Sequence, residues 1–331
     1  MRQMKVWYDA CTGKHMRYGN ALAKRLRSRG HEVVLTTREH PDTVGVADVV
    51  GEKPVVVGKY DPASLFSRLE ASASRMMGFS KLFRDRLPDM AVAHQSVELC
   101  RTAFGLGVPI TLTADTPHAV AVNKLTIPLA NTLVISKAIP IHFFRRYGAS
   151  DIVQFDGVDE VAWIKGFKPN KGFDFKRPLI VVRQMETRAS YALGKEDVTL
   201  KLAEKLSQLG SVLFFSRYVK SERKGLIVVK GFVDSASAAA HADLVVSIGG
   251  TISREAALQG VPSIAVSEIS RTYVNRFLAR RGFPLFLVDS SKALECAKKY
   301  LGKRFDVEGK LASLTNPVDV LEKVITGKDN A

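Results

Sequence analysis

The strongest signal in this chain is Asp243-Leu-Val-Val-Ser-Ile-Gly-Gly-Thr-Ile-Ser-Arg-Glu-Ala-Ala-Leu-Gln-Gly-Val-Pro262. Its aliphatic beginning, Asp243–Ser247, predicts a buried strand, and Ser253–Gln259 predicts the helix that follows. Gly249 and Gly250 between them allow the backbone to approach a ligand closely, and the start of the helix offers unpaired N–H groups and the positive end of the helix dipole. This combination suits a pyrophosphate bound at the carboxyl edge of a parallel sheet.

The rest of the chain repeats the same alternation of short aliphatic runs and longer amphipathic stretches. This pattern is typical of parallel sheets with crossover helices. In the first half we expect a helix at Met16–Arg29, closed by Gly30 as its C-cap, and another at Pro62–Arg86. The strands expected around them are Lys5–Tyr8, Glu32–Thr36, Pro54–Val57, Asp89–Ala93, Pro109–Leu112, Thr132–Ile135 and Ile152–Phe155.

A segment rich in Gly, Pro and Lys, Ile164–Arg177, interrupts this alternation and has the composition of a linker. A second series follows it, with strands at Leu179–Val182, Val212–Phe215, Leu226–Val229, Ser263–Val266 and Leu285–Val288, and helices at Glu196–Gln208, Ser235–His241, Thr272–Arg281 and, behind Asn316 as N-cap, Pro317–Ile325. We therefore predict an α/β protein of two Rossmann-like domains, residues 1–165 and 166–331, whose mostly parallel sheets face each other across a cleft. The last helix is expected to pack back on the first domain.

The composition is that of a folded globular protein, with 46% hydrophobic and 25% charged residues among 331. The three cysteines, Cys11, Cys100 and Cys296, are far apart, which favours neither a disulfide framework nor a metal site. No stretch is apolar over the roughly 18–20 residues that a membrane span needs. The sequence begins with strand-like residues instead of a signal peptide. We therefore expect a cytoplasmic protein.

The net charge of +16 favours anionic partners such as nucleotide phosphates or acidic lipid headgroups. The alternative is a basic surface that is simply solvated. Nucleic acid is not an expected partner because no nucleic-acid-binding motif is present. The segment Ile141–Tyr147 combines three aromatic residues with two arginines. It is either a half-buried amphipathic helix or a patch for peripheral contact with an anionic membrane or a lipid-linked acceptor at the inner membrane face.

The quoted stretch supplies the main candidates for ligand binding. Glu255 lies about one turn into the predicted helix, from where its carboxylate can accept a hydrogen bond from a sugar hydroxyl. The alternative is structural: the two glycines make only a tight turn, and Glu255 pairs with the helix dipole. Arginines at the same predicted sheet edge, Arg183 and Arg217, fit the charge of a diphosphate, although each is also compatible with an ordinary surface position.

Polar loops at the carboxyl ends of two first-half strands supply candidates for catalysis. The first loop offers Thr12, Gly13 and Lys14 for binding and His15 as an acid or base near neutral pH. Its alternative is an ordinary loop with a capping threonine and a surface histidine. The second, Thr113–His118, places a carboxylate, Asp115, near an imidazole, His118, so the two can share acid–base work. Alternatively, Asp115 caps a helix that begins at Pro117.

Several motifs resemble the prokaryotic family called domain of unknown function 354, which is grouped with proteins of glycosyltransferase-B architecture. The motifs are spread over nearly the whole chain: Asp115-Thr-Pro-His-Ala with Asn123-Lys-Leu-Thr-Ile-Pro-Leu-Ala, Asp156-Gly-Val-Asp-Glu-Val-Ala-Trp with Phe167-Lys-Pro, Val182-Arg-Gln with Ala189-Ser-Tyr, Ser216-Arg-Tyr, and Gly249-Gly-Thr-Ile-Ser-Arg-Glu-Ala-Ala-Leu-Gln-Gly-Val-Pro. The resemblance specifies a family and no reaction.

The second half is more distantly similar to the donor domain of the peptidoglycan N-acetylglucosaminyltransferase MurG and to UDP-N-acetylglucosamine 2-epimerases. This similarity implies that Glu255 binds the uridine ribose and that a Gly-rich loop holds the diphosphate. The residues implied in diphosphate binding are Ser247, Gly249, Gly250 and Thr251, and we add Arg254 from the same helix. The segment Glu268–Asn275 lacks the paired glutamines that help to hold the donor sugar in MurG-like enzymes, so the sugar is left open.

Together these observations predict a glycosyltransferase that uses a nucleotide sugar, UDP-linked by the resemblance, as substrate and needs no metal or other cofactor. Helix dipole and arginines can stabilise the leaving diphosphate without a metal ion. His15, Asp115 and His118 are then the catalytic candidates. One alternative is a sugar-nucleotide epimerase that uses Asp115, Glu160 and His15. Another is a protein that binds nucleotide sugars without converting them. The acceptor and the oligomeric state are not specified.

Overall fold

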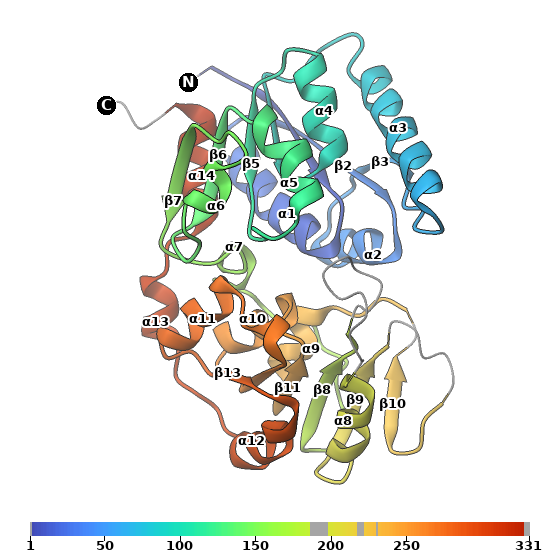
Figure 1. Ribbon diagram of the computed structural model, residues 1–331, viewed down its shortest axis with the longest axis vertical. Coiled ribbons are helices and arrows are strands. Elements are labelled where there is room, and N and C mark those ends of the chain that lie inside the picture. The colour runs from blue at the N-terminus through green and yellow to red at the C-terminus, as the bar shows by residue number, and fades with distance from the viewer. Residues whose placement is uncertain (1, 186–197, 217–221, 230, 328–331) are drawn as a thin grey trace. The chain divides into compact units, whose positions relative to one another are not determined.

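The computed structural model describes residues 2–185, 198–216, 222–229 and 231–327 (Figure 1). The chain divides into two compact units. Unit 1 comprises Met1–Trp163 and Thr315–Ala331, and unit 2 comprises Ile164–Leu314. Each unit is built around its own parallel sheet with helices between successive strands. The predicted fold class, an α/β protein with two parallel sheets, is therefore confirmed.

In its described residues, the sheet of unit 1 has seven strands in the order β3-β2-β1-β4-β5-β6-β7. Every neighbouring pair runs parallel. The chain moves from β1 outward to β3, then returns to place β4 on the other side of β1. The point at which the strand order reverses lies between β1 and β4. The strands are β1 (Lys5–Ala10), β2 (Glu32–Glu39), β3 (Val55–Lys59), β4 (Met90–His94), β5 (Ile110–Thr113), β6 (Thr132–Ser136) and β7 (Asp151–Phe155).

The helices of unit 1 begin and end at residues with recognisable capping chemistry. Thr12 caps α1 (Gly13–Ser28), and Ser64 forms a capping box at the start of α3 (Leu65–Leu82). The predicted helix Pro62–Arg86 is therefore shorter than expected. Gly19 lets α1 lie close to β1, because a Cβ at this position would lie 2.5 Å from the ring of Tyr8. The other helices are α2 (Pro41–Val50), α4 (Val97–Gly105), α5 (Val120–Thr126), α6 (His142–Arg145), α7 (Val161–Ile164) and α14 (Pro317–Thr326).

The sheet of unit 2 has six strands in its described part, in the order β10-β9-β8-β11-β12-β13, again all parallel. Its order reverses between β8 and β11. Alternate residues of these central strands, such as Val182 and Val181, belong to separate cores on the two faces of the sheet. The strands are β8 (Leu179–Arg183), β9 (Ser211–Phe215), β10 (Leu226–Val229), β11 (Leu244–Ser247), β12 (Ser263–Val266) and β13 (Leu285–Val288).

Helices cover both faces of this second sheet. The predicted helix Ser253–Gln259 begins two residues earlier in the structure, at Thr251, so Gly250 is its N-cap. The beginning of the helix predicted at Glu196–Gln208 lies partly outside the described residues. The helices are α8 (Thr199–Leu206), α9 (Ser235–His241), α10 (Thr251–Leu258), α11 (Tyr273–Arg280), α12 (Ala293–Tyr300) and α13 (Glu308–Ser313).

The last helix, α14, belongs to unit 1, where it packs against α1. Its start has the predicted chemistry: the Asn316 side chain accepts from the N–H of Val318, and Pro317 is the first helical residue. Ion pairs fix it to α1. Glu322 lies 2.8 Å from Arg25 and 2.9 Å from Arg29. These contacts join segments nearly 300 residues apart in sequence.

Candidate functional site

In unit 2, the Gly249–Gly250 loop lies where ligands bind in open parallel sheets. It directly follows β11, at the carboxyl edge and beside the point where the strand order reverses. Gly249 has a φ of +85°, a conformation that favours glycine. A Cβ at Gly249 would also lie 2.7 Å from the Asn275 amide nitrogen and 2.8 Å from the Ser270 Cβ. The first glycine is therefore required by the fold itself.

Buried polar side chains hold this loop in place. Asn275, which is fully buried, donates to the carbonyl oxygen of Gly249 over 2.8 Å and to that of Ser270 over 2.7 Å. Arg254 donates to the Asn275 side chain over 3.2 Å, and only 5% of its own surface is exposed. Arg254 therefore supports the loop through Asn275, and its predicted contact with the donor stays a prediction.

Ser247 also belongs to the support of the loop. Its hydroxyl oxygen accepts from the N–H of Gly249 over 2.9 Å and lies 2.6 Å from the hydroxyl of Ser253. Gly250 and Thr251 differ in this respect. Gly250 is exposed, offers no side-chain cap to α10, and a Cβ at this position would meet only open space. The accessible start of α10 is therefore the part of the loop that can receive an anion.

Glu255 is the fifth residue of α10 and is fully buried. Its Oε2 accepts a hydrogen bond of 2.7 Å from the hydroxyl of Ser235, the first residue of α9. This contact fixes one carboxylate oxygen at the junction of the two helices. A buried carboxylate costs free energy unless its oxygens are satisfied, so the contact with Ser235 stabilises Glu255 in this position.

Of the two arginines expected near the diphosphate, Arg183 lies in the described part of the structure. Arg183 ends β8, the strand next to β11, and therefore shares the carboxyl edge with Gly249 and Gly250. Its guanidinium carbon lies 6.0 Å from the centre of the Phe215 ring. Arg217 lies outside the described residues.

In unit 1, a charged cluster forms at the carboxyl edge of the sheet. Lys14, at the start of α1, places its Nζ 2.5 Å from Asp115 Oδ2, 2.7 Å from Asp159 Oδ2 and 3.4 Å from His94 Nε2. The four side chains are largely buried, with 4–16% of their side-chain surface exposed. His94 ends β4 and Lys14 follows β1, so the cluster straddles the point where the strand order of unit 1 reverses.

His15 packs beside this cluster. Its ring centre lies 4.8 Å from that of His94, and its Nδ1 is buried without a hydrogen-bond partner. Burial lowers the pKa of the His15 imidazole well below its ordinary value, and the nearby His94 and Lys14 lower it further. His15 is therefore neutral near pH 7 and can accept a proton. The hydroxyl of Thr12 accepts from the N–H of His15, so Thr12 caps α1. A capping threonine is what the alternative interpretation of this loop predicts.

Asp115 and His118, expected to share acid–base work, have different surroundings in the structure, and their joint role stays a prediction. Asp115 joins Lys14, whereas His118 lies in the exposed turn that precedes α5. Helix α5 begins at Val120, so the prediction that Asp115 caps a helix starting at Pro117 is wrong. Glu160, the epimerase candidate, is buried directly after Asp159 in the sequence.

His94 and Asp159 are site residues that sequence reasoning missed. His94 is preceded by four residues of a buried strand and followed by Gln95, whose φ of +53° is rare for a residue other than glycine. Such strain commonly marks a functional turn. The sequence does contain a signal for this site. The polar series His94-Gln-Ser96 follows a predicted strand, in the same way as the two polar loops that contain His15 and Asp115.

A second buried charge network lies next to the first. Arg75 of α3 reaches Asp9 on β1, with a distance of 2.8 Å between Nη2 and Oδ1, and both side chains are at most 1% exposed. Its other Nη atom lies 3.3 Å from Glu98. Asp9 also accepts from the hydroxyls of Thr36 and Ser96 over 2.8 and 2.6 Å. This network joins α3 to the ends of β1 and β4, which carry the Lys14 cluster.

The aromatic–basic segment Ile141–Tyr147 contains a short helix, α6, in which Phe144 is fully buried and Arg145 is exposed. Arg146 lies over the rings of Phe143 and Tyr147. Within the described ranges, no helix has both the length and the apolar character needed to cross a bilayer. Peripheral membrane contact of this segment stays a prediction.

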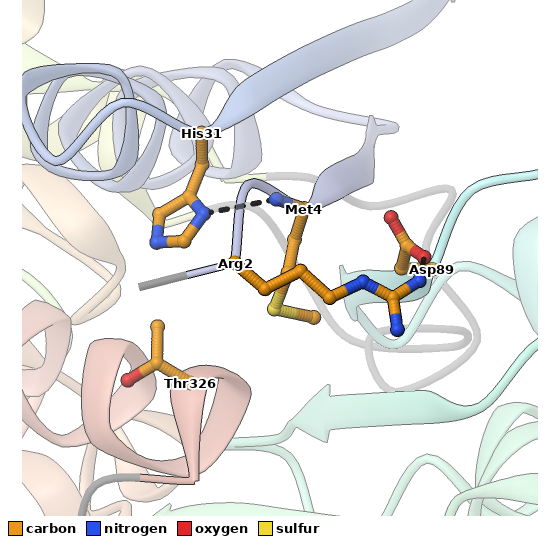
Figure 2. Close-up of a pocket in the computed structure, with 5 residues that line it drawn as sticks. All are labelled: Arg2, Met4, His31, Asp89 and Thr326. Carbon is orange, nitrogen blue, oxygen red and sulfur yellow. Dashed lines mark hydrogen bonds and ion pairs between the residues drawn. The ribbon is translucent and has the colours of Figure 1, made fainter.

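A hollow of about 330 Å³ lies elsewhere in unit 1 (Figure 2). Its lining residues precede their strands: Met4 precedes β1, His31 precedes β2 and Asp89 precedes β4, with Arg2 and Thr326 completing the wall. His31 Nδ1 accepts from the N–H of Met4 over 3.2 Å, and Arg2 pairs with Asp89. The hollow is therefore at the amino edge of the sheet, opposite the Lys14 cluster.

Comparison with solved structures defines the class of fold. The UDP-GlcNAc 2-epimerase of Methanocaldococcus jannaschii, solved in complex with UDP-GlcNAc and UDP, is similar with a TM-score of 0.72 at 13% identity, covering 98% of this chain and 99% of that one. The glycosyltransferase SnogD of Streptomyces nogalater is similar with a TM-score of 0.57 at 15% identity, over 98% and 99% of the two chains. The fold is therefore the glycosyltransferase-B architecture that these proteins share.

The family is established by sequence. Residues 4–328 match the model of the family described as protein of unknown function DUF354, and the chain belongs to this family. The uncharacterized protein MJ0665 of Methanocaldococcus jannaschii is 28% identical over 338 residues, covering 97% of both chains. The resemblance inferred from the motifs is thus confirmed.

Proposed function

We propose that this protein is a metal-independent glycosyltransferase that uses a nucleotide sugar as donor. The observation that carries the proposal is the accessible start of α10 at the point of strand reversal in unit 2. Gly250 is exposed with open space around it and no side chain caps α10, and Gly249 is held by Asn275. A diphosphate matches this arrangement in charge and in hydrogen-bonding capacity.

Glu255 and Arg183 extend the proposed donor site. The Glu255 carboxylate lies one turn beyond Gly250 and is suited to accept from the hydroxyls of a ribose. The Arg183 guanidinium, at the end of the neighbouring strand, is suited to the diphosphate charge. The solved relative that contains UDP-GlcNAc and UDP supports a uridine nucleotide as the first ligand to test.

The Lys14 cluster is the proposed source of acid–base chemistry. A glycosyl transfer requires a group that takes the proton from the attacking hydroxyl of the acceptor. Asp115 is the more exposed carboxylate of the cluster, and His15 is a neutral imidazole beside it. Either group can accept this proton directly, and Lys14 stabilises the carboxylate in its ionised form.

An epimerase is the second candidate, and one observation favours it. The structures named as epimerases have TM-scores of 0.67–0.72, above the 0.56–0.61 of the glycosyltransferases. The Lys14 cluster offers more than one acid–base group, as reversible proton transfer at a sugar carbon requires. The two candidates therefore share the nucleotide-sugar site and differ in whether an acceptor is needed.

A two-stage experiment tests the proposal. First, a thermal-shift screen against a panel of nucleotide sugars identifies the ligand, because a bound ligand raises the melting temperature by mass action. The protein is then incubated with that nucleotide sugar alone and the mixture is followed by NMR. Conversion to an isomer without any acceptor identifies an epimerase. Conversion only after addition of an acceptor supports the glycosyltransferase, and failure of every nucleotide sugar to bind contradicts both.

A further inference from the structure

Three side chains of types that ligate metal ions surround the ammonium group of Lys14. They are His94, Asp115 and Asp159, and one ligand atom from each lies within 4.8 Å of the others, close enough to surround a single ion. The Lys14 Nζ is in contact with all three of them. The position that a cation would take among these ligands is thus occupied by a cation of the chain itself.

The hydrogen-bonding pattern fits this description. An ammonium group has three N–H donors, and Asp115 Oδ2, Asp159 Oδ2 and, in the tautomer protonated at Nδ1, His94 Nε2 can accept from them. The other ring nitrogen of His94, Nδ1, lies 2.8 Å from the hydroxyl oxygen of Thr113. Histidines that bind a metal through Nε2 are commonly oriented by such a contact at Nδ1. The imidazole is therefore already held in the orientation that a metal ligand needs.

Charge makes the central cation necessary. Asp115 and Asp159 are largely buried, and two carboxylates that approach one position repel each other strongly in a low-dielectric environment. Lys14 sets one positive charge against these two acidic side chains. A divalent ion in the same place would neutralise the pair completely.

Polar atoms without partners lie beside the cluster. Both His15 Nδ1 and the hydroxyl of Tyr18 are buried and lack a hydrogen-bond partner, and Tyr18 is fully buried. The rings that carry these two groups both lie next to the His94 ring, at centre-to-centre distances of 4.8 Å for His15 and 6.1 Å for Tyr18. Three protein ligands leave coordination positions for water on a hexacoordinate metal ion.

We propose that Lys14 is the built-in cation of a carboxylate–imidazole site, and that His94, Asp115 and Asp159 bind a divalent first-row metal ion once its ammonium group is removed. The two carboxylates and one imidazole favour Mn²⁺, Fe²⁺ or Co²⁺. In the native chain the ammonium excludes these ions and takes over their electrostatic role. The inference concerns unit 1 alone and does not depend on the proposed reaction or on a nucleotide.

A second group of potential metal ligands among the described residues also surrounds a basic side chain. Asp9, Cys11 and Glu98 also have ligand atoms within 4.8 Å of one another. The guanidinium group of Arg75 contacts all three, at 2.8 Å from Asp9, 3.3 Å from Glu98 and 3.8 Å from the Cys11 sulfur. Basic side chains thus occupy both places in the described structure where a metal ion would fit.

The test compares Co²⁺ binding by the native chain and by Lys14→Ala. Alanine suits the first turn of α1, and removal of a positive charge from a helix N-terminus favours the helix. Lys14→Ala should bind one Co²⁺ per chain with a visible absorption band and a raised melting temperature, whereas the native chain should show neither. Ethylammonium should compete with Co²⁺, because it restores the missing ammonium group.

A matched control assigns the ligands. In the Lys14→Ala background, Asp159→Asn should weaken Co²⁺ binding by at least the roughly tenfold that is lost when an outer hydrogen-bond partner of a metal ligand is removed. Equal Co²⁺ affinity of the native chain and Lys14→Ala would overturn the proposal. Binding that survives Asp159→Asn unchanged would overturn it as well, because the ion would then be elsewhere.

A metal-free measurement covers the case in which Lys14→Ala does not fold. Lys14→Met keeps the length of the side chain and removes its charge, so it should lower the melting temperature. Adding Asp159→Asn to Lys14→Met should then recover part of the loss, because it removes one of the two uncompensated carboxylates. A double variant less stable than Lys14→Met alone would contradict the role of Lys14 as the central cation.

Discussion

Lys14 and Asp159 are 145 positions apart in the sequence, yet their charged groups lie 2.7 Å from each other at one edge of a single sheet. Lys14 follows the first strand of unit 1, and Asp159 follows the last. Their contact defines the charged cluster at the carboxyl edge and places His94 and Asp115 around the same ammonium group. The proposed acid–base chemistry and the built-in cation both depend on this arrangement.

Replacement of Arg75 by methionine should strongly destabilise the protein. The substitution leaves the fully buried Asp9 without its cation, and removal of one partner of a buried ion pair costs about 3–5 kcal/mol. Urea unfolding measures the loss. Arg68→Met, at an exposed position of the same helix, is the control and should change stability by less than about 0.5 kcal/mol. Similar small effects for both variants would show that the Arg75 network does not support the site.

His15 should make the stability of the native chain depend on pH. Because its pKa in the folded state lies well below the ordinary value of 6.5, the unfolded state binds more protons than the folded state between these two pKa values. The contribution of neutral His15 to stability is therefore fully present above about pH 7 and is lost as the pH falls below about 6.5. Urea unfolding from pH 7.5 to 5.5 should show this decrease.

The variant His15→Gln isolates this effect. It cannot titrate, so its unfolding free energy should fall less steeply over the same pH range. His118→Gln is the matched control, because His118 is exposed, and it should retain the native slope. If the slopes of the native chain and His15→Gln coincide, His15 is not the buried neutral imidazole described above.

Gly249→Ala should destabilise unit 2. The φ of +85° disfavours any side chain, and the new Cβ would press against the Asn275 amide and Ser270. Strain of this kind costs about 1–3 kcal/mol. Gly250→Ala is the control, since its φ of −77° is ordinary and nothing lies near the new Cβ, so its melting temperature should stay close to that of the native chain. Equal melting temperatures for both variants would contradict the described packing of the loop.

Glu255→Gln should weaken binding of a nucleotide sugar. A hydrogen bond to a charged group contributes about 1.5–3 kcal/mol, which corresponds to roughly ten- to a hundredfold in affinity. Glutamine can still accept from Ser235, so the fold should persist. Calorimetric titration measures the affinity, and Ser235→Ala serves as a comparison that disturbs the same contact without removing the carboxylate. Unchanged affinity together with a large drop in melting temperature would make Glu255 a purely structural residue.

The strands and helices of this fold can be predicted from the sequence because each is specified by a local pattern of residues. The strands Ser263–Val266 and Leu285–Val288 and the capped start of the last helix at Asn316 appear as expected. The Gly249–Gly250 loop was found for the same reason, since strand, glycines and helix are contiguous. The extent of α3 was less well predicted, because the Ser64 capping box and the packing of Phe83 set its ends.

The charged cluster of unit 1 could not be assembled from the sequence alone. Its members lie at or just after the carboxyl ends of β1, β4, β5 and β7, and only the order of the strands brings these ends together. Spacing in the sequence brings Asp115 only near its neighbour His118, whereas its contact with Lys14 follows from the fold. The supporting role of Arg254 was hidden for a similar reason, because its partner Asn275 lies on another helix.

The calorimetric affinity of UDP-N-acetylglucosamine for the native chain and for Gly250→Val tests whether the start of α10 binds the diphosphate. The backbone at Gly250 is extended, with φ −77° and ψ −165°, and valine fits this conformation, so the variant should melt close to the native temperature. Its branched side chain would nevertheless cover the start of α10, where the diphosphate is proposed to bind. We predict measurable binding by the native chain and none by Gly250→Val. Equal affinity of the two proteins would contradict the assignment of the diphosphate to this loop.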